Sequence, residues 1–312
     1  MRSFSKGNRV FMIGCDLGSN TLRIVEIGCK NKTRIKAFER IVRTAKDLHV
    51  TGRISETSKH AILNALHEAS ELFDFKDEKC FCVTTEAMRV ASNAQEILEE
   101  IKATFGLHFE IISGDKEAYL TSLAIEHALK REHFDHKTYV LFDLGGGSTE
   151  LTFCLNGIKH SQSFPFGIIN TAERYTSERE AHVARIVESI HTFTQMQPEI
   201  PSTFLQLVTT AGTPTTVAAF LEGLDYAHYD ARKVNGKVLH VNDFEEAYTR
   251  LSAMDEDEAE RFTGTNRRDL VVVGILIVKA MMHKLGFDKC IVVDDGLREG
   301  VVLEQCYNLE IS

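Results

Sequence analysis

The sequence contains the same glycine-rich phrase twice, once near its start and once near its middle. Asp16-Leu-Gly-Ser-Asn-Thr21 and Asp143-Leu-Gly-Gly-Gly-Ser-Thr149 each follow one apolar run and precede another. Glycine lets backbone N–H groups approach a ligand, hydroxyl side chains donate hydrogen bonds to it, and an aspartate at a strand end can hold Mg²⁺ directly or through water. A tight hairpin turn would not require an aspartate at the same offset twice. The repeat therefore predicts two phosphate-binding loops in a duplicated fold.

Hydrophobic periodicity predicts that each phrase opens a similar series of elements. Three strand-like runs are followed by alternating helices and strands, so the order βββαβαβα occurs about twice and indicates a duplicated α/β architecture. The expected strands are residues 10–16, 22–27, 34–42, 79–84, 109–112, 139–143, 150–155, 158–164, 204–209 and 290–293. The expected helices are residues 56–75, 93–105, 117–129, 181–194, a helix after Thr213, 270–282 ending at Gly286, and 297–306.

Length and hydropathy limit the class of protein. The chain has 312 residues, about twice the size of one ordinary domain, which favours two domains with room for a cleft. The longest apolar run, residues 270–278, is too short to span a membrane, and the apolar stretch after Arg9 reaches Asp16 too soon for a signal peptide. We therefore expect a cytoplasmic protein without a membrane partner.

The seven cysteines are odd in number and far apart, which fits reduced thiols better than a disulfide framework. Cys80 and Cys82 form the one close pair. In a strand they would share a face, and because a second pair is missing, core packing is favoured over metal binding.

The formal net charge of −9, taken alone, argues against a protein that binds polyanions, nucleic acid among them, but the charge is unevenly distributed. Residues 1–53 carry twelve Lys or Arg and four acidic residues. This segment is either an anion-binding face or a solvated basic edge. On the first interpretation, changing Arg23, Lys30, Lys32 or Arg34 to Glu raises KM for a long polyanion more than it lowers kcat.

Two further segments carry possible chemistry. Gly212 and Thr213 follow a strand and precede a helix expected to begin at Pro214, so the first free N–H groups of that helix could bind an anion. Glu117 lies at a strand-to-helix turn, where a carboxylate facing a phosphate could orient and deprotonate water. An acid stabilised by the helix dipole is an adequate alternative explanation for Glu117.

Six phrases, spread over nearly the whole chain, resemble the exopolyphosphatase/guanosine pentaphosphate phosphohydrolase (Ppx/GppA) family in its short two-domain form. They are Asp16-Leu-Gly-Ser-Asn-Thr, Thr84-Thr-Glu-Ala-Met-Arg89, Ile112-Ser-Gly-Asp-Lys-Glu-Ala118, Asp143-Leu-Gly-Gly-Gly-Ser-Thr-Glu150, Ala211-Gly-Thr213 and Gly296-Leu-Arg-Glu-Gly300. The resemblance implies an α/β fold of two ribonuclease-H-like lobes with a cleft between them, as in actin, sugar kinases and heat-shock ATPases. Lobe I would be residues 1–124 plus the C-terminal helix 300–312, and lobe II residues 125–299.

The resemblance also implies roles for individual residues. Glu117 would be the catalytic base and Arg89 would bind phosphoryl oxygens, while Asp143 and Glu150 would hold Mg²⁺, with Mn²⁺ as a substitute. The expected phosphate-binding residues are Asp16, Gly18, Ser19, Asn20, Thr21, Lys116, Gly145, Gly146, Gly147, Ser148, Thr149, Gly212 and Thr213.

The implied activity is hydrolysis of the terminal phosphate of inorganic polyphosphate, with guanosine pentaphosphate, a nucleotide of the stringent response, as the second substrate. A homodimer is also implied. A kinase-like phosphotransferase would need an adenosine pocket, and Val293-Asp294-Asp295-Gly296 supplies one glycine where such a pocket usually has two. A non-catalytic sensor of polyphosphate or guanosine tetraphosphate is a third hypothesis.

Two departures from the family pattern qualify this picture. Lys116 replaces the acid that commonly precedes the catalytic glutamate, which adds a positive charge beside the base. The sequence also ends at residue 312, without the helical C-terminal domains of long members, which puts processive action on long chains in doubt.

Overall fold

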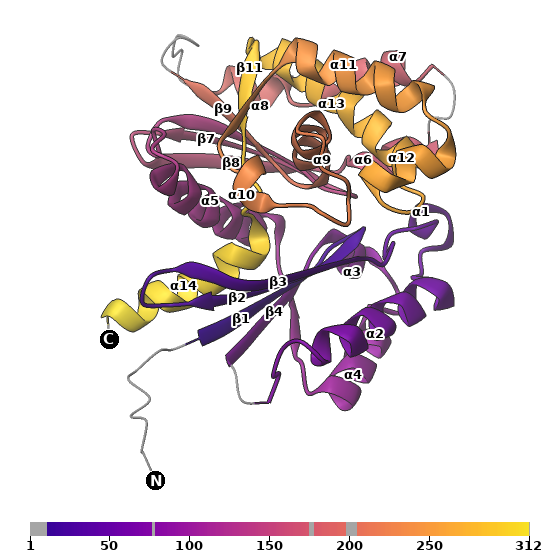
Figure 1. The fold of residues 1–312 in the computed structure, drawn as a ribbon, viewed down its shortest axis with the longest axis vertical. Helices are drawn as coiled ribbons and strands as arrows, with labels where there is room; N and C mark the ends of the chain where they lie inside the picture. The colour runs from indigo at the N-terminus through magenta and orange to yellow at the C-terminus, as the bar shows by residue number, and fades with distance from the viewer. Residues whose placement is uncertain (1–10, 77–78, 175–177, 198–204, 312) are drawn as a thin grey trace. The chain divides into compact units, whose positions relative to one another are not determined.

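The computed structural model describes residues 11–76, 79–174, 178–197 and 205–311 of the chain. They form two compact units, which Figure 1 colours along the chain. The first unit comprises Met1–Ser113 and Leu297–Ser312, and the second comprises Gly114–Gly296. The boundaries expected from the sequence, 124/125 and 299/300, lie later. The first of them would cut α5 (Gly114–Arg131), a continuous helix that packs on the sheet of the second unit.

The first unit is built on a five-stranded sheet in the order β3-β2-β1-β4-β5, with β1 antiparallel to β2 and parallel to β4. Its strands are β1 (Phe11–Leu17), β2 (Thr21–Gly28), β3 (Thr33–Ile41), β4 (Lys79–Thr84) and β5 (Phe109–Ile111). Its helices are α1 (Leu48–Thr51), α2 (Glu56–Ser70), α3 (Glu86–Val90), α4 (Ala94–Phe105) and α14 (Leu297–Ile311).

The last helix, α14, covers one face of this sheet. Val302 and Cys306 of α14 pack against Met12, Val25 and Ile27 of β1 and β2. The approach is close because Gly14 has no side chain: a Cβ there would lie 2.3 Å from the carbonyl oxygen of Arg298. Helices α2 and α4 pack against each other and cover the opposite face, as right-handed crossovers between parallel strands require.

A disulfide between Cys29 and Cys306 joins the end of β2 to α14, with the two Cα atoms 5.1 Å apart. The expectation that all cysteines are reduced is therefore wrong for this pair. The residues lie 277 positions apart in the sequence, so no spacing pattern could have paired them. Cys80 and Cys82 are free thiols of β4, and Cys82 lies in the core, as predicted.

We expect the Cys29→Ser variant to unfold at a lower temperature than the wild type. The disulfide closes a loop of almost the whole chain, and loss of a native disulfide costs about 2–5 kcal/mol. The measurement is thermal unfolding of wild type and variant with and without a reductant. Reduction should lower the midpoint of the wild type and leave that of the variant unchanged, whereas Cys80→Ser should respond to reductant as the wild type does. Equal midpoints for oxidised and reduced wild type would contradict this role of the disulfide.

The second unit is built on a six-stranded sheet in the order β10-β11-β9-β6-β7-β8. Its strands are β6 (Tyr139–Leu144), β7 (Thr149–Leu155), β8 (Ile158–Phe164), β9 (Gln206–Thr210), β10 (Lys237–His240) and β11 (Lys289–Val292). Besides α5, its helices are α6 (Ile168–Arg174), α7 (Arg179–Glu188), α8 (His191–Gln195), α9 (Gly212–Leu221), α10 (Ala231–Val234), α11 (Val241–Ala253), α12 (Glu256–Thr263) and α13 (Arg268–Leu285).

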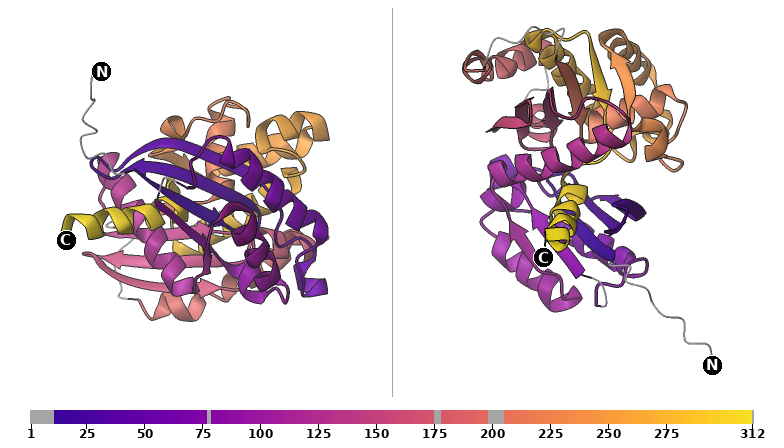
Figure 2. Two further views of the ribbon diagram at one scale, coloured as in Figure 1. Left: turned by 90° about the horizontal axis from the view of Figure 1, so that it is seen from below. Right: turned by 90° about the vertical axis from the view of Figure 1, so that its left-hand side faces the viewer.

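Helices cover both faces of the second sheet, as the two views of Figure 2 show. Ile125 and Leu129 of α5 pack on Tyr139 and Leu141 of β6. Helices α9 and α13 form the core on the opposite face, which includes Phe142. Successive side chains of a strand point to opposite faces of the sheet. Asp143, two residues after Leu141 on β6, therefore points to the face that α5 covers.

The two sheets confirm the duplication predicted from the sequence. Each sheet contains three consecutive antiparallel strands, β1–β3 in the first and β6–β8 in the second. Counted from the third of these strands, the orders β3-β2-β1-β4-β5 and β8-β7-β6-β9-β11 are the same. The predicted strand 79–84 matches β4. The predicted helix end at Gly286 matches the left-handed C-cap of α13. The predicted helix 181–194 is two helices, α7 and α8, while β10 and α11 were not predicted. Within the described residues, no helix is both long enough and apolar enough to cross a bilayer.

Candidate active site

The first glycine-rich loop connects β1 to β2. The Gly18 N–H donates to the Thr21 carbonyl at 2.9 Å and closes the turn. Backbone N–H groups that follow β3 donate to the carbonyls of this loop. Those of Val42 and Arg43 donate to Asn20 O, and that of Ala45 donates to Ser19 O. In a trans peptide the N–H points away from the C=O, so these bonds direct the attached N–H groups to the other side of the loop.

The second loop, between β6 and β7, repeats this turn. The Gly145 N–H donates to the Ser148 carbonyl at 3.0 Å, in the position of the Gly18 bond. The Thr149 hydroxyl is fully buried and donates to the Phe166 carbonyl at 2.7 Å. This hydroxyl therefore holds the loop in place, and a phosphate contact of Thr149 would have to come from its backbone.

Two predicted metal ligands lie side by side in the second unit. The β6–β7 register places Asp143 directly opposite Glu150, which puts their Cβ atoms about 5 Å apart on one face of the sheet. Glu150 is 2% exposed, and the Ser163 hydroxyl donates to its Oε1 at 2.7 Å. Two neighbouring carboxylates favour a cation between them, and hard oxygen donors suit Mg²⁺.

The donor set at this pair is small. In the described part of the chain, no group of three or more His, Cys, Asp and Glu could hold a metal ion. Mg²⁺ usually keeps several waters and is bound through one or two carboxylates together with substrate phosphates. Asp143 and Glu150 fit that pattern, with the remaining ligands supplied by water and phosphate oxygens.

The start of α5 brings Glu117 to the same region. Glu117 lies in the first turn of α5 and is 9% exposed. A Cβ on Gly114 would lie 2.9 Å from Cβ of Ser163, the residue that binds Glu150, so only glycine lets the helix begin this close. Lys116 is half-buried, and its ammonium group lies 5.0 Å from the ring centre of Tyr119.

The first unit contains the same framework with different charges. Asp16 lies opposite Arg23, in the position where Asp143 meets Glu150. Arg23 lies opposite Glu39 and pairs with it at 3.0 Å, and Arg298 in the first turn of α14 lies 3.8 Å from Glu39. The negative charge of a carboxylate beside an arginine is already neutralised, whereas the carboxylate pair of the second unit is suited to binding a cation.

Arg89 lies in α3, directly after β4. Its Nη1 donates to the Ile112 carbonyl at 2.7 Å, which anchors the guanidinium at the end of β5. The β1–β4 register places Thr84 beside Leu17, and the Thr84 hydroxyl donates to the Leu17 carbonyl at 2.6 Å. Arg89 and the first glycine-rich loop are therefore both positioned at the carboxyl ends of parallel strands.

The Gly212–Thr213 segment begins α9 two residues earlier than expected. Thr213 is 1% exposed and packs against α13, where a Cβ on Gly274 would lie 2.0 Å from the Thr213 hydroxyl oxygen. An anion at this helix start would therefore meet backbone N–H groups rather than the Thr213 side chain.

Acidic side chains neutralise much of the basic segment. Arg34 pairs with Glu299 at 2.9 Å, Lys36 pairs with Glu26 at 3.1 Å, and Lys32 pairs with Glu310. Lys30 and Lys32 lie in the turn between β2 and β3, at the far end of the eight-residue strand β2 from the first loop, roughly 25 Å away. The ion pairs favour the solvated-edge interpretation over a steering face, and Arg2, Lys6 and Arg9 lie outside the described residues.

Sequence reasoning overlooked Arg267. Arg267 is 6% exposed and directly precedes α13, and its guanidinium carbon lies 6.0 Å from the ring centre of Tyr226. Its buried Nε has no hydrogen-bond partner among the residues that the structure describes. A buried guanidinium of this kind is a candidate for an anionic ligand, because an uncompensated buried charge is costly. The run Arg267-Arg268 before an apolar helix was the available signal.

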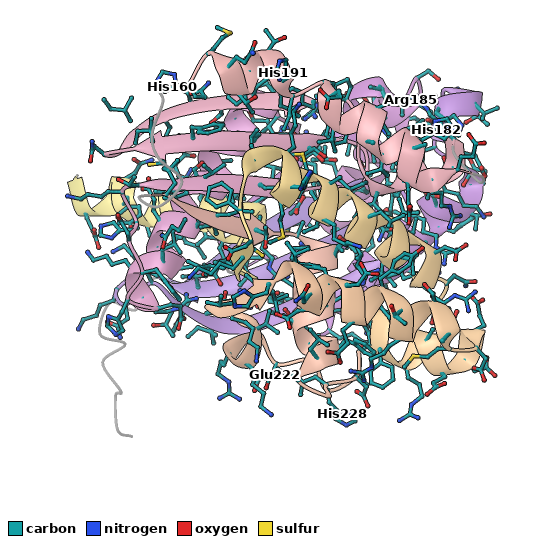
Figure 3. All side chains as sticks on the ribbon, turned by 90° about the horizontal axis from the view of Figure 1, so that it is seen from above. His160, His182, Arg185, His191, Glu222 and His228 are labelled. Atoms are coloured by element: carbon teal, nitrogen blue, oxygen red, sulfur yellow. A yellow bond between two sulfur atoms is a disulfide. The ribbon has the colours of Figure 1, made fainter. Side chains whose placement is uncertain are left out.

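Four histidines of the second unit are labelled in Figure 3. His160, His182, His191 and His228 come from β8, α7, α8 and the segment before α10 and do not converge.

A sequence model of the Ppx/GppA phosphatase family matches residues 24–309. The chain belongs to the Ppx/GppA phosphatase family. An Aquifex aeolicus member of the Ppx/GppA family has a solved structure that is 28% identical to this chain, covers 98% of it and all of its own length, and superposes with a TM-score of 0.75. The actin-like, two-domain α/β fold expected from the sequence is thereby confirmed.

Three curated relatives place this Ppx/GppA member among phosphatases. It is 22% identical to a bifunctional 3-dehydroquinate synthase/phosphatase of Fusobacterium nucleatum, over 96% of this chain and 47% of that protein. It is 25% identical to exopolyphosphatase 2 of Mycobacterium tuberculosis, over 95% and 98% of the two chains. It is also 25% identical to a guanosine-5'-triphosphate,3'-diphosphate pyrophosphatase of Pseudoalteromonas translucida, over 95% of this chain and 60% of that one. The chain thus spans about half of the first of these proteins and nearly all of the second.

Proposed function

We propose that the protein is a Mg²⁺-dependent phosphoanhydride hydrolase that releases the terminal phosphate of inorganic polyphosphate. The observation that carries this proposal is the Asp143–Glu150 pair. The two residues lie opposite each other on β6 and β7, at the base of a glycine-rich loop. A cation held by the pair and an anion held by the loop would meet at one place. The mycobacterial exopolyphosphatase, matched over nearly its full length, supports polyphosphate as the substrate class.

The residues divide the chemistry among them. In the second unit, Glu117 orients the attacking water and takes its proton, while the backbone N–H groups of the glycine-rich loop hold phosphoryl oxygens and Lys116 opposes the negative charge that develops on the transferred group. In the first unit, Arg89 and the backbone N–H groups of the first loop are the groups that we propose to bind phosphoryl oxygens. Mg²⁺, held by Asp143 and Glu150, would neutralise phosphate oxygens and polarise the bond that breaks.

Guanosine pentaphosphate is the second candidate substrate. The Pseudoalteromonas relative supports it, but this chain spans only 60% of that protein. A homodimeric state stays a prediction from the family resemblance, and a cytoplasmic location stays a prediction from the sequence. The deciding experiment measures phosphate release from polyphosphate of two lengths, guanosine pentaphosphate and ATP, each with and without Mg²⁺. Phosphate release from none of the four would contradict the proposal.

We expect Glu150→Gln to weaken Mg²⁺ binding by at least about tenfold, because a neutral amide removes one charge from a pair that binds a divalent cation. Calorimetric titration with Mg²⁺ measures this directly, and the Mg²⁺ concentration for half-maximal phosphate release should rise in parallel. Asp257→Asn, in the exposed acidic turn of α12, is the matched control and should bind Mg²⁺ as the wild type does. Wild-type affinity in Glu150→Gln would exclude Glu150 as a ligand.

A further inference from the structure

The segment after β8 is bonded to the back of the second glycine-rich loop. Its backbone and one side chain donate to three successive loop carbonyls: Ile168 N–H to Gly145 O at 3.0 Å, Ile169 N–H to Gly146 O at 2.8 Å, and Asn170 Nδ2 to Gly147 O at 2.8 Å. The contact is tight, since a Cβ on Gly167 would lie 2.5 Å from the Gly146 carbonyl. We call residues 166–170 the strap.

The strap determines where three N–H groups point. Each bonded carbonyl belongs to the same trans peptide as the next residue's N–H, which must point the opposite way. The N–H groups of Gly146, Gly147 and Ser148 are therefore directed away from the strap. Among the described residues, none of these three N–H groups donates to a protein acceptor. Successive N–H groups on one side of a loop form a nest that binds anions.

One of these three bonds depends on a side chain. The Asn170 carboxamide accepts from the Gly167 N–H at 2.7 Å through Oδ1 and donates to Gly147 O through Nδ2. It thereby fixes the peptide that carries the Ser148 N–H. In the described part of the first unit, the donors to the corresponding carbonyls, those of Ser19 and Asn20, are all backbone N–H groups. In the second loop the Gly147 carbonyl is therefore held by one replaceable side-chain amide.

We infer that Asn170 is a positioning residue for phosphoryl binding at the second loop. It touches neither the substrate nor the proposed metal ligands, and it acts by holding the Ser148 N–H toward the phosphoryl oxygens. The inference rests on the proposed function, because it requires phosphate at this loop.

The test compares Asn170→Ala and Asn170→Asp with the wild type. Alanine removes both bonds, whereas aspartate keeps the acceptor for Gly167 and places a carboxylate oxygen against the Gly147 carbonyl. We expect each variant to bind inorganic tripolyphosphate about tenfold more weakly in calorimetry and to lose at least about tenfold in kcat, with thermal midpoints close to that of the wild type. Repeating the titrations at high salt separates geometry from charge, because salt reduces a charge penalty and leaves the lost hydrogen bond. Gln162→Ala, an exposed amide on β8, is the matched control.

The possible outcomes are distinct. Wild-type affinity and kcat in both variants would overturn the inference. Wild-type behaviour of Asn170→Asp beside a defective Asn170→Ala would also overturn it, because the Gly167 bond and not the Gly147 bond would then matter. A wild type that neither binds nor hydrolyses tripolyphosphate would overturn the proposed function together with this inference.

Discussion

Replacing Glu117 with glutamine is expected to lower the rate of phosphate release by about 10²-fold or more while leaving substrate affinity within about twofold. Glutamine has nearly the same shape but cannot accept the proton of the attacking water. Glu117 is buried in the first turn of α5, and because the two side chains are isosteric, an amide should fit there without moving the helix. Steady-state phosphate release and calorimetric binding of tripolyphosphate together measure the two effects.

Asp115→Asn is the matched control for this experiment. Asp115 lies in the same turn of α5 and is exposed, so its amide also removes one negative charge near the helix start. The control should retain nearly full activity. If Glu117→Gln and Asp115→Asn lose activity equally, the effect reflects the helix dipole rather than proton transfer, and Glu117 is not the base.

The second large effect is expected for Gly14→Ala, which should destabilise the first unit by about 3 kcal/mol or more. The added methyl group would lie 2.3 Å from the Arg298 carbonyl and 2.6 Å from Cγ2 of Val302. One of these contacts is with backbone, so the whole of α14 must move away from β1. The first turn of α14 carries Arg298, which lies 3.8 Å from Glu39. We therefore also expect the movement of α14 to disturb the ion pair between Arg23 and Glu39, next to Asp16. Chemical denaturation with circular dichroism measures the stability loss.

Gly28→Ala provides the comparison within the same pair of strands. A Cβ there would meet the Phe11 ring at 3.6 Å and Cδ1 of Ile35 at 3.8 Å, which are ordinary van der Waals contacts. This variant should unfold close to the wild-type midpoint. Equal stability of Gly14→Ala and the wild type would mean that α14 does not press on β1 as the structure describes.

The sequence was sufficient for features that depend on local pattern. β4 was predicted with its exact bounds because a short apolar run is enclosed by polar residues, and α13 because its apolar stretch ends at a glycine that adopts a left-handed conformation. The duplicated loops were recognised because glycine and aspartate recur at fixed offsets. By contrast, α7 and α8 were merged because both keep helical spacing, and α11 was overlooked because its buried residues are few, Phe244, Ala247 and Leu251.

The family resemblance named Asp143 and Glu150 as metal ligands, but the strand register that brings residues of the site together could not be derived from local sequence pattern. Asp143 and Glu150 are seven residues apart, and only strand pairing makes them neighbours. The same pairing places Arg23 beside Asp16, which distinguishes the charge of the two loops. The ion pairs of Arg34 and Lys32 with α14 join the two ends of the chain, so a count of basic residues over positions 1–53 could not reveal their neutralisation.

The return of α14 to the first sheet also sets an order for folding on the ribosome. The strands β1–β5 leave the ribosome first, yet Met12, Val25 and Ile27 have no covering helix until residues 302–306 have been made. The second unit is a continuous segment that is made in that interval, and its last strand, β11, is completed only shortly before α14. At ordinary translation rates, that interval is on the order of 10 s, during which one apolar face of the nascent sheet is open to chaperones or to another nascent chain.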